Sequence, residues 1–245
     1  MPYDRSIVRQ ETGYWCGPAS AQVVLNSRGI HVDESDLARE MGTTWNGTDF
    51  IGQIERVLDA RVPDARYTSV QMPNDPPTAE QRARLWRDIV RSIDAGWGVI
   101  VNIVAPPSNY PRAVAPSTIS PAYSGGTVYH YMTVMGYDDE QRSVWIADSG
   151  FNPFGYWLDF DQLATLIPPK GTATPTSSLP RLPRLRRRRA GWTSTRSRRR
   201  WVERSRVSGT PRCCRRSPRR CGRPAAPRSS ARPCGARSSA TNRSG

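Results

Sequence analysis

The sequence predicts an α+β domain over residues 1–173, followed by a basic tail over residues 174–245. Two observations predict this fold class: helical patterns of apolar residues fill the first half of the domain, and strand-like runs dominate after residue 97. Helices that precede strands are typical of an antiparallel sheet with helices packed on it. Charge sets the tail apart, because the domain holds 14 basic and 20 acidic residues, whereas the tail holds 22 arginines and one acid.

Four helices are expected in the first half of the domain. Residues 17–28 place apolar side chains at helical spacing and include a proline in the first turn, where its missing N–H has no helical partner. Residues 33–41 form a second amphipathic segment that ends at a glycine. Thr48 is expected to open a third helix over residues 48–60, and residues 79–95 put their apolar side chains on one stripe.

Strands are expected mainly in the second half. Residues 98–105 are a continuous β-branched run, which is typical of a strand buried on both faces. Residues 128–137 and 143–148 flank a turn and predict a hairpin. Residues 106–126 form a long loop rich in Pro, Ser, Gly and Tyr, and loops of this length are usually functional or disordered. A short strand over residues 66–70 and a closing aromatic segment with a short helix complete the domain.

Cys16 precedes the first expected helix directly, and the next cysteine in the chain is Cys213. A thiol at a helix N-terminus lies at the positive end of the helix dipole, which favours the thiolate that attacks carbonyl groups. The alternative is that Cys16 is a small core residue, since free cysteine is often fully buried. The surrounding sequence does not choose between these interpretations.

A cysteine nucleophile needs a base, a group that orients the base, and donors for the oxyanion. His130 lies within a predicted strand and is the candidate base, because His31 lies past the far end of the cysteine's own helix, on the order of 20 Å away. Asp148 ends the next strand, where a carboxylate can orient an imidazole. The Gln10 side-chain amide, six residues before Cys16, would form a two-donor oxyanion hole together with the Cys16 N–H. Taken singly, the three residues also fit ordinary roles: a core histidine, a turn acid and an exposed glutamine.

Taken together, three segments resemble the motifs of the C39-like cysteine peptidases, a group with a papain-like fold. QETGYWCGPAS, HYMTVMGYDD and VWIADSG occur in the order of the family motifs, and the resemblance covers about residues 3–170. The third segment departs from the family pattern, because Ser149 stands where the family commonly has proline. The resemblance implies that Cys16 is the nucleophile, His130 the base, Asp148 the orienting acid and Gln10 the oxyanion donor.

Within this family, the sequence looks most like the N-terminal peptidase modules of endolysins from phages of actinobacteria. The resemblance implies a cysteine endopeptidase that cleaves peptide bonds of bacterial peptidoglycan and needs no cofactor; we expect a monomer. The alternatives are a C39 peptidase that processes leader peptides and a catalytically inactive C39-like module. The aromatic residues Tyr110, Tyr123, Trp15 and Trp45 either face the substrate or pack in the core and its rim.

The tail, residues 174–245, lacks Ile, Phe, Tyr and Met. Such a segment cannot bury enough apolar surface to offset its ordering entropy, so we expect it to be disordered. Its four cysteines match no zinc-binding spacing and no histidine accompanies them, so no metal site is expected. Its arginines suit non-specific binding of nucleic acid or anionic surfaces, which makes a nucleic-acid-binding protein a further alternative. The abrupt change of composition also favours a frameshift near residues 171–180.

Two observations bear on where the protein acts. No run of about 18 apolar residues occurs, so no membrane-spanning helix is expected. The N-terminal sequence MPYDRSIVRQ lacks the apolar region of a Sec-type signal peptide. We therefore expect synthesis in the cytoplasm and action at the bacterial cell wall after release by another route.

Overall fold

The computed structural model of the chain describes residues 8–177. The helices are α1 (Cys16–Asn26), α2 (Glu34–Met41), α3 (Ile51–Arg61), α4 (Ala79–Asp94) and α5 (Phe160–Leu166). The strands are β1 (Tyr67–Gln71), β2 (Val99–Ala105), β3 (Val128–Asp138), β4 (Ser143–Ala147), β5 (Gly155–Asp159) and β6 (Gly171–Pro175). The tail expected to be disordered and to bind nucleic acid spans residues 174–245, of which residues 178–245 lie outside the described residues. Its first two residues, Thr174 and Pro175, belong to β6.

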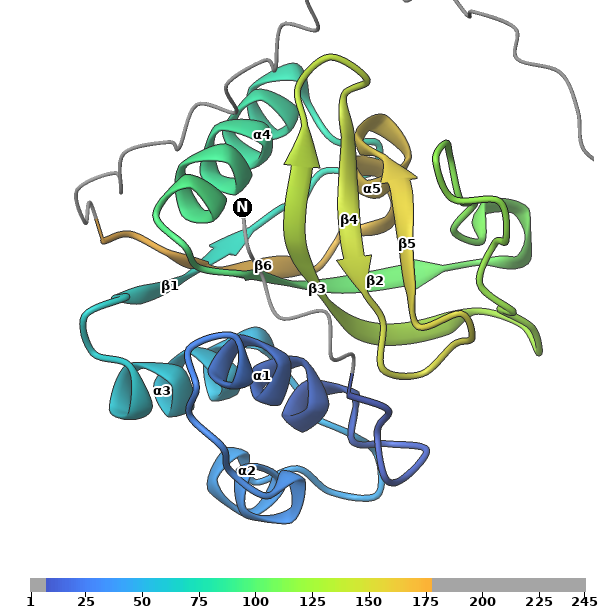
Figure 1. Ribbon diagram of the computed structural model, residues 1–245. Coiled ribbons are helices and arrows are strands. Elements are labelled where there is room, and N and C mark those ends of the chain that lie inside the picture. Colours follow the sequence, from blue (N-terminus) through green and yellow to red (C-terminus); the bar gives the residue numbers. More distant parts are fainter. Residues whose placement is uncertain (1–7, 178–245) are drawn as a thin grey trace, which may run out of the picture. The chain divides into compact units, whose positions relative to one another are not determined.

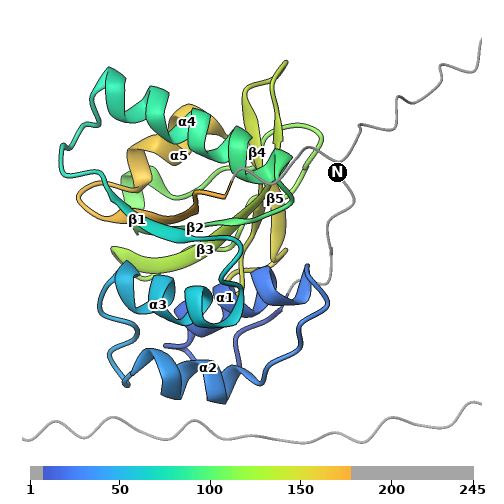
Figure 2. The same ribbon diagram turned by 90° about the vertical axis from the view of Figure 1, so that its left-hand side faces the viewer.

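The described strands form one antiparallel sheet in the order β1-β6-β2-β3-β4-β5. Helices α1 and α3 cover one face, with α2 packed against them, and α4 and α5 cover the other face (Figures 1 and 2). This arrangement confirms the α+β class predicted from the sequence. No helix within residues 8–177 is long and apolar enough to cross a membrane.

Helix α1 packs on β3, which fixes the position of Cys16 at its first turn. Val24 and Leu25 are fully buried between the helix and the sheet. Each fully buried aliphatic side chain of this size stabilises the fold by roughly 1.5–3 kcal/mol. The hydroxyl of Thr133 in β3 also donates to the carbonyl of Ser20 at 3.1 Å. Packing and hydrogen bonding thus hold the helix against the strand that carries His130.

Helix α4 closes the core on the opposite face. The side chain of Thr78 accepts a hydrogen bond from the Gln81 N–H, and the side chain of Gln81 accepts one from the Thr78 N–H. This reciprocal cap satisfies N–H groups at the start of the helix. Leu85, Ile89 and Ile93 then point into the core beneath the helix. The sheet is therefore buried on both faces, as the β-branched sequence of β2 predicts.

Strand β1 lies at one edge of the sheet, and α3 protects that edge. The Asp59 carboxylate accepts from the Tyr67 N–H at 2.7 Å, and the Glu55 carboxylate accepts from the Ser69 N–H at 2.7 Å. N–H groups that are capped in this way are unavailable to another strand. The edge is therefore closed to strand addition at these two positions.

Strand β6 differs from the sequence-based expectation. Its sequence, GTATP, combines glycine and proline with small residues, and no strand is predicted there. In the structure it pairs with both β1 and β2, and Ala173 is fully buried. Pairing with the neighbouring strands therefore determines the strand conformation of β6, although its own sequence has little preference for a strand. The strand also continues two residues beyond the expected domain boundary at residue 173.

The expected start of the third helix at Thr48 is wrong, because α3 begins at Ile51. The polar groups of Thr48 contact residues outside α3: its carbonyl accepts from the Tyr131 hydroxyl at 3.2 Å. Its side chain also lies against Gly17, where an added Cβ would come within 2.4 Å of the Thr48 hydroxyl oxygen. The loop before α3 is therefore packed against the first turn of α1, next to Cys16.

Candidate active site

Cys16 is the first residue of α1, and its side chain is partly exposed. The sulfur is hydrogen-bonded by His130 and by the backbone N–H groups of Gly17 and Tyr131. These donors and the helix dipole all favour a negative sulfur. The setting is that of a polarised thiol, in contrast to a cysteine enclosed by apolar side chains.

His130 and Asp148 form a buried pair at the ends of two neighbouring strands. His130 is the third residue of β3, and Asp148 directly follows β4, which is paired with β3. Nε2 of His130 lies 2.9 Å from Oδ1 of Asp148. The same imidazole also interacts with the Cys16 thiol. The predicted hairpin is therefore what brings the imidazole and the carboxylate together.

Five donors surround the Asp148 carboxylate, which is fully buried. Besides the imidazole, Oδ1 accepts from the N–H groups of Gly150 at 3.0 Å and Phe151 at 3.2 Å. Oδ2 accepts from the hydroxyls of Tyr123 at 2.9 Å and Tyr156 at 3.0 Å. Burial alone would raise the pKa of Asp148, but the imidazole charge and these donors hold that pKa below its ordinary value. The group is therefore an anion fixed in one orientation.

The anion at Asp148 controls the protonation of the other two groups. Burial alone would lower the pKa of His130, but the charge and hydrogen bond of Asp148, with a smaller contribution from Cys16, raise it to about 10. Burial alone would raise the pKa of the Cys16 thiol, but the hydrogen bond and charge of His130 and the two backbone donors lower it. The site thus holds His130 as an imidazolium at neutral pH and shifts Cys16 towards the thiolate.

Gln10 lies beside the turn that follows Asp148. Its backbone N–H donates to the Ser149 carbonyl at 3.0 Å, and its Oε1 accepts from the Ser149 hydroxyl at 3.1 Å. A Cβ placed on Gly150 would lie 3.1 Å from Oε1 of Gln10 and 3.0 Å from Cε1 of His130. Gln10 and His130 therefore flank the same glycine. The structure brings the four residues predicted from the sequence into one region.

The four aromatic residues that could face the substrate or pack in the core have different environments. Tyr123 follows the packing alternative: it is buried, donates to the Asp148 carboxylate and stacks on Phe151 with ring centres 3.8 Å apart. Tyr110 is partly buried against the core, and its hydroxyl donates to a loop carbonyl. Trp15 is partly buried, whereas Trp45 is 78% exposed. Trp45 therefore stays the most accessible of the four candidates.

Sequence reasoning missed the contacts that support the predicted residues. Tyr123 and Tyr156 hold Asp148, and Ser149 and Gly150 join Asp148 to Gln10. Of these, Gly150 offered a sequence signal, since a glycine after a strand often marks a tight turn or a close approach of backbone. The two tyrosines carry no pattern that links them to an acid elsewhere in the chain.

The second histidine lies away from the site. His31 is exposed, and its Nδ1 lies 3.1 Å from Oδ1 of Asn26. This placement is consistent with the exclusion of His31 as the candidate base. Among residues 8–177, no group of three or more His, Cys, Asp or Glu side chains is placed to hold a metal ion.

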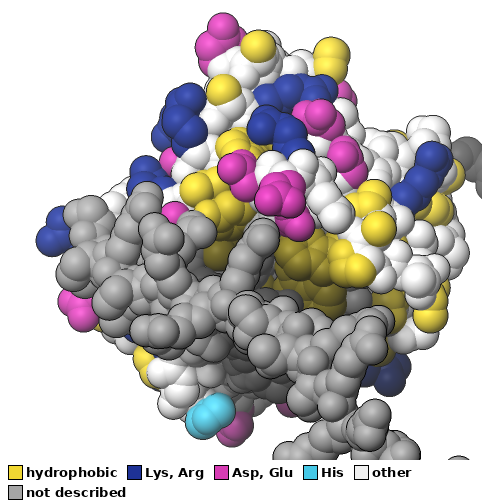
Figure 3. Space-filling view, turned by 45° about the horizontal axis from the view of Figure 1, so that its top comes forward, with side chains coloured by type: hydrophobic (Ala, Val, Ile, Leu, Met, Phe, Trp, Pro, Cys, Tyr) yellow, Lys and Arg dark blue, Asp and Glu magenta, His cyan; other side chains and the backbone are white. Residues whose placement is uncertain are grey.

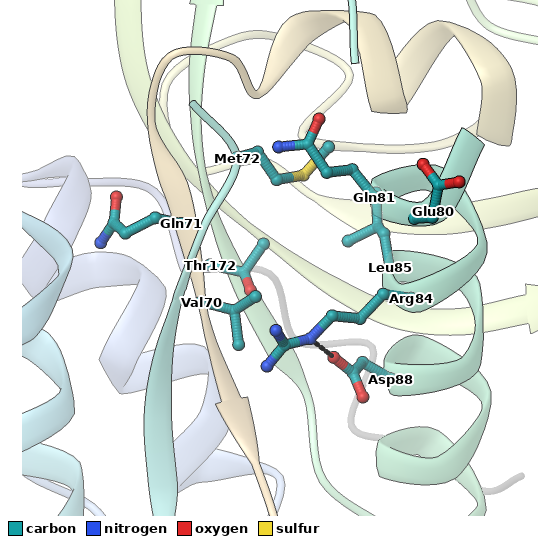
Figure 4. A pocket seen from close by; sticks show the side chains of 9 residues that line it. All are labelled: Val70, Gln71, Met72, Glu80, Gln81, Arg84, Leu85, Asp88 and Thr172. Carbon is teal, nitrogen blue, oxygen red and sulfur yellow. Dashed lines mark ion pairs between the residues drawn. The ribbon is translucent and has the colours of Figure 1, made fainter. Parts of the chain in front are cut away.

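A pocket of about 200 Å³ lies on the opposite face of the sheet, between β1 and α4 (Figure 4). Met72 and Leu85 supply apolar surface, and Arg84 forms an ion pair with Asp88 across 3.5 Å. On the described part of the face in Figure 3, basic and acidic side chains are interspersed around a hollow with hydrophobic side chains. Because Cys16 belongs to α1 on the other face, the pocket is separate from the candidate active site.

Known proteins resemble this chain in sequence and in fold. Residues 4–163 match the Peptidase_C39 like family. A stretch of 51 residues is 47% identical to an uncharacterized protein of Methanothermobacter marburgensis; it covers 21% of this chain and 36% of that protein. The chain thus spans about a third of the length of this curated relative.

Two solved structures are similar at 16% sequence identity, and each similarity covers 69% of this chain. One is a crystal structure described as a C39-like peptidase from Bacillus anthracis, with a TM-score of 0.44 and 92% of that chain covered. The other is the peptidase domain of Streptococcus ComA, a bifunctional ABC transporter of a quorum-sensing pathway, with a TM-score of 0.43 and 96% covered.

The family match extends over more than half of the chain and includes the segments that carry Cys16, His130 and Asp148. It places the chain in the class of C39-like cysteine peptidases. The chain belongs to the Peptidase_C39 like family.

Proposed function

We propose that the protein is a cysteine endopeptidase in which Cys16 is the nucleophile and His130 the general acid and base. Asp148 orients and charges the imidazole, and Gln10 donates to the oxyanion. The observation that carries this proposal is the chain of contacts from the Asp148 carboxylate through the His130 imidazole to the Cys16 sulfur. Such a chain is what a thiolate nucleophile requires.

The reaction follows from the proposed protonation states. The Cys16 thiolate attacks the peptide carbonyl carbon, and the carbonyl oxygen becomes an anion that accepts from the Cys16 N–H and the Gln10 amide. As the C–N bond breaks, the His130 imidazolium gives its proton to the departing amine, which leaves a thioester on Cys16. The neutral imidazole then takes a proton from water, and the resulting hydroxide cleaves the thioester. The product acid leaves, and the thiolate–imidazolium pair is restored.

For the substrate, we propose peptides of bacterial peptidoglycan, with action at the cell wall. The support is the resemblance of the three motif segments to the peptidase modules of actinobacteriophage endolysins. The exposed Trp45 lies in the loop that also contains Thr48, which packs against the first turn of α1. An aromatic side chain there is accessible to a ligand that reaches Cys16 along this loop.

The test compares the full chain with its Cys16→Ala variant. Both proteins are incubated with purified peptidoglycan and with a panel of double-glycine leader peptides, and new amino termini are measured. We expect new amino termini from peptidoglycan, with a rate that falls by at least about two orders of magnitude in the variant. If only the leader peptides were cleaved, the proposed peptidoglycan substrate would be wrong and leader peptides would take its place. Equal rates for the two proteins would contradict the cysteine mechanism.

A further inference from the structure

We propose that Ser149 is a positioning residue that sets the orientation of the Gln10 side-chain amide. The inference rests on the proposed function, because it concerns how Gln10 is held to stabilise the oxyanion. Ser149 replaces the proline of the family pattern, and it is 2% exposed. Its hydroxyl is therefore buried at a position where proline supplies no donor.

The Thr12 carbonyl fixes which end of the Gln10 amide faces which neighbour, and the Ser149 hydroxyl then holds the other end. Nε2 of Gln10 donates to the Thr12 carbonyl at 2.7 Å, and a carbonyl oxygen can only accept. Oε1 must then lie on the other side, where the Ser149 hydroxyl donates to it at 3.1 Å. A flipped amide would set two acceptors against each other at Thr12. The second Nε2 hydrogen has no partner among the described residues, so it is free to donate to a substrate oxygen.

The backbone around Gln10 is held from two further sides. The Gln10 N–H donates to the Ser149 carbonyl at 3.0 Å. The next residue, Glu11, donates its N–H to both carboxylate oxygens of Glu34, at 3.1 and 3.3 Å. Glu34 is 1% exposed, so this anchor is part of the packed interior at the start of α2. Because these contacts fix the backbone of Gln10, the Ser149 hydroxyl acts on the side-chain torsions of Gln10.

The turn Asp148–Ser149–Gly150 therefore serves two catalytic groups. Asp148 holds His130, and Ser149 holds Gln10. The Gly150 Cα lies between them, since a Cβ there would approach both the His130 ring and the Gln10 Oε1 within about 3 Å. The distance between the base and the oxyanion donor is set by one short segment of backbone.

The test uses Ser149→Ala in the full chain, with Ser143→Ala as a matched control. Ser143 is also a buried serine, and its hydroxyl has no hydrogen-bond partner among the described residues. Three quantities are compared: kcat and KM for release of amino termini from purified peptidoglycan, the rate of Cys16 alkylation by iodoacetamide followed by mass spectrometry, and the melting temperature. Alkylation forms no oxyanion, so it reports the thiolate alone.

We expect Ser149→Ala to lower kcat about tenfold, as for the loss of one buried hydrogen bond, with KM and the alkylation rate unchanged. Combined with Gln10→Ala, it should have no additional effect on kcat, because its role acts through Gln10. Ser143→Ala should keep the wild-type kcat.

A wild-type kcat in Ser149→Ala, or an additive effect in the double variant, would overturn the inference while leaving the peptidase intact. A parallel loss of alkylation and hydrolysis would also overturn it, since the damage would then lie at Cys16. Absence of hydrolysis by the wild-type protein would remove both the inference and the proposed function.

Discussion

Replacement of Asp148 by asparagine removes one buried charge with little change of shape. In the wild-type protein, Oδ1 of Asp148 lies 2.9 Å from Nε2 of His130. The asparagine oxygen can still accept from this nitrogen and from the Gly150 N–H. The hydroxyls of Tyr123 and Tyr156, which donate to Oδ2, can turn and accept from the new amide. We therefore expect Asp148→Asn to fold and its main effect to be electrostatic.

The size of the effect follows from the separation of the charges. Two unit charges about 4 Å apart interact by about 4 kcal/mol at an effective dielectric constant of about 20. This energy corresponds to about 3 pKa units. The pKa of His130 is about 10 with Asp148 in place. In the variant it should fall towards the ordinary histidine value of about 6.5, and the imidazolium that lowers the pKa of Cys16 should be lost at neutral pH.

The assay is the pH dependence of Cys16 alkylation by iodoacetamide, measured by mass spectrometry on the peptide that contains Cys16. Since the pKa of Cys16 is lowered in the wild-type protein, alkylation should persist below the ordinary thiol pKa of about 8.5. In Asp148→Asn the onset should move to higher pH. Peptide hydrolysis should fall by roughly 10²–10⁴-fold. Tyr123→Phe, which removes one hydrogen bond and keeps the charge, should shift the onset less.

Superimposable alkylation profiles for the wild-type protein and Asp148→Asn, with both proteins folded by circular dichroism, would refute this reasoning. In that case, the charge of Asp148 would not control the protonation of Cys16 and His130.

Three further substitutions probe other contacts. Gly150→Ala adds a methyl that would lie 3.0 Å from the His130 ring, so we expect kcat to fall at least about tenfold; an unchanged kcat would show that the ring can move away freely. Gly17→Ala would bring a methyl within 2.4 Å of the Thr48 hydroxyl and should cost about 1–3 kcal/mol in denaturant unfolding, whereas wild-type stability would exclude a tight contact. Burial raises the pKa of Glu34 to about 7, above its ordinary value of 4.5. The folded state therefore binds an extra proton between these values, and wild-type stability should decline as the pH rises through them. Glu34→Gln removes this decline, so its stability relative to the wild-type protein should rise by up to about 3 kcal/mol between pH 5 and pH 8. If the difference in stability between Glu34→Gln and the wild-type protein did not change with pH, the raised pKa of Glu34 would be contradicted.

Local patterns in the sequence predict the elements that carry the site. The helix after Cys16 follows from apolar spacing and a first-turn proline, and α1 begins one residue earlier than expected, at Cys16 itself. The hairpin that joins His130 to Asp148 follows from two apolar runs around a turn, and β3 and β4 are paired. These features depend on neighbours in sequence, which is why they can be inferred without a structure. The pairing of Cys16 with His130 follows from the exclusion of His31 as the base and from the family resemblance.

The supporting contacts could not be predicted, because they join residues far apart in sequence. The Ser149 hydroxyl and Gln10 are 139 positions apart, and the Tyr123 hydroxyl and Asp148 are 25 apart. A serine or tyrosine in a loop has many possible partners, and packing of the whole domain selects one. Strand β6 illustrates the same limit, since its strand geometry is imposed by β1 and β2.

The central claim is that Cys16 forms a covalent bond to the substrate, and trapping the acyl intermediate tests it most directly. The full chain is mixed with peptidoglycan fragments, quenched in acid and analysed by peptide mass spectrometry. We predict an acyl adduct on the peptide that contains Cys16, and none in His130→Ala or Cys16→Ala. Cleavage of the fragments by Cys16→Ala at the wild-type rate, with no adduct on the wild-type protein, would contradict the account.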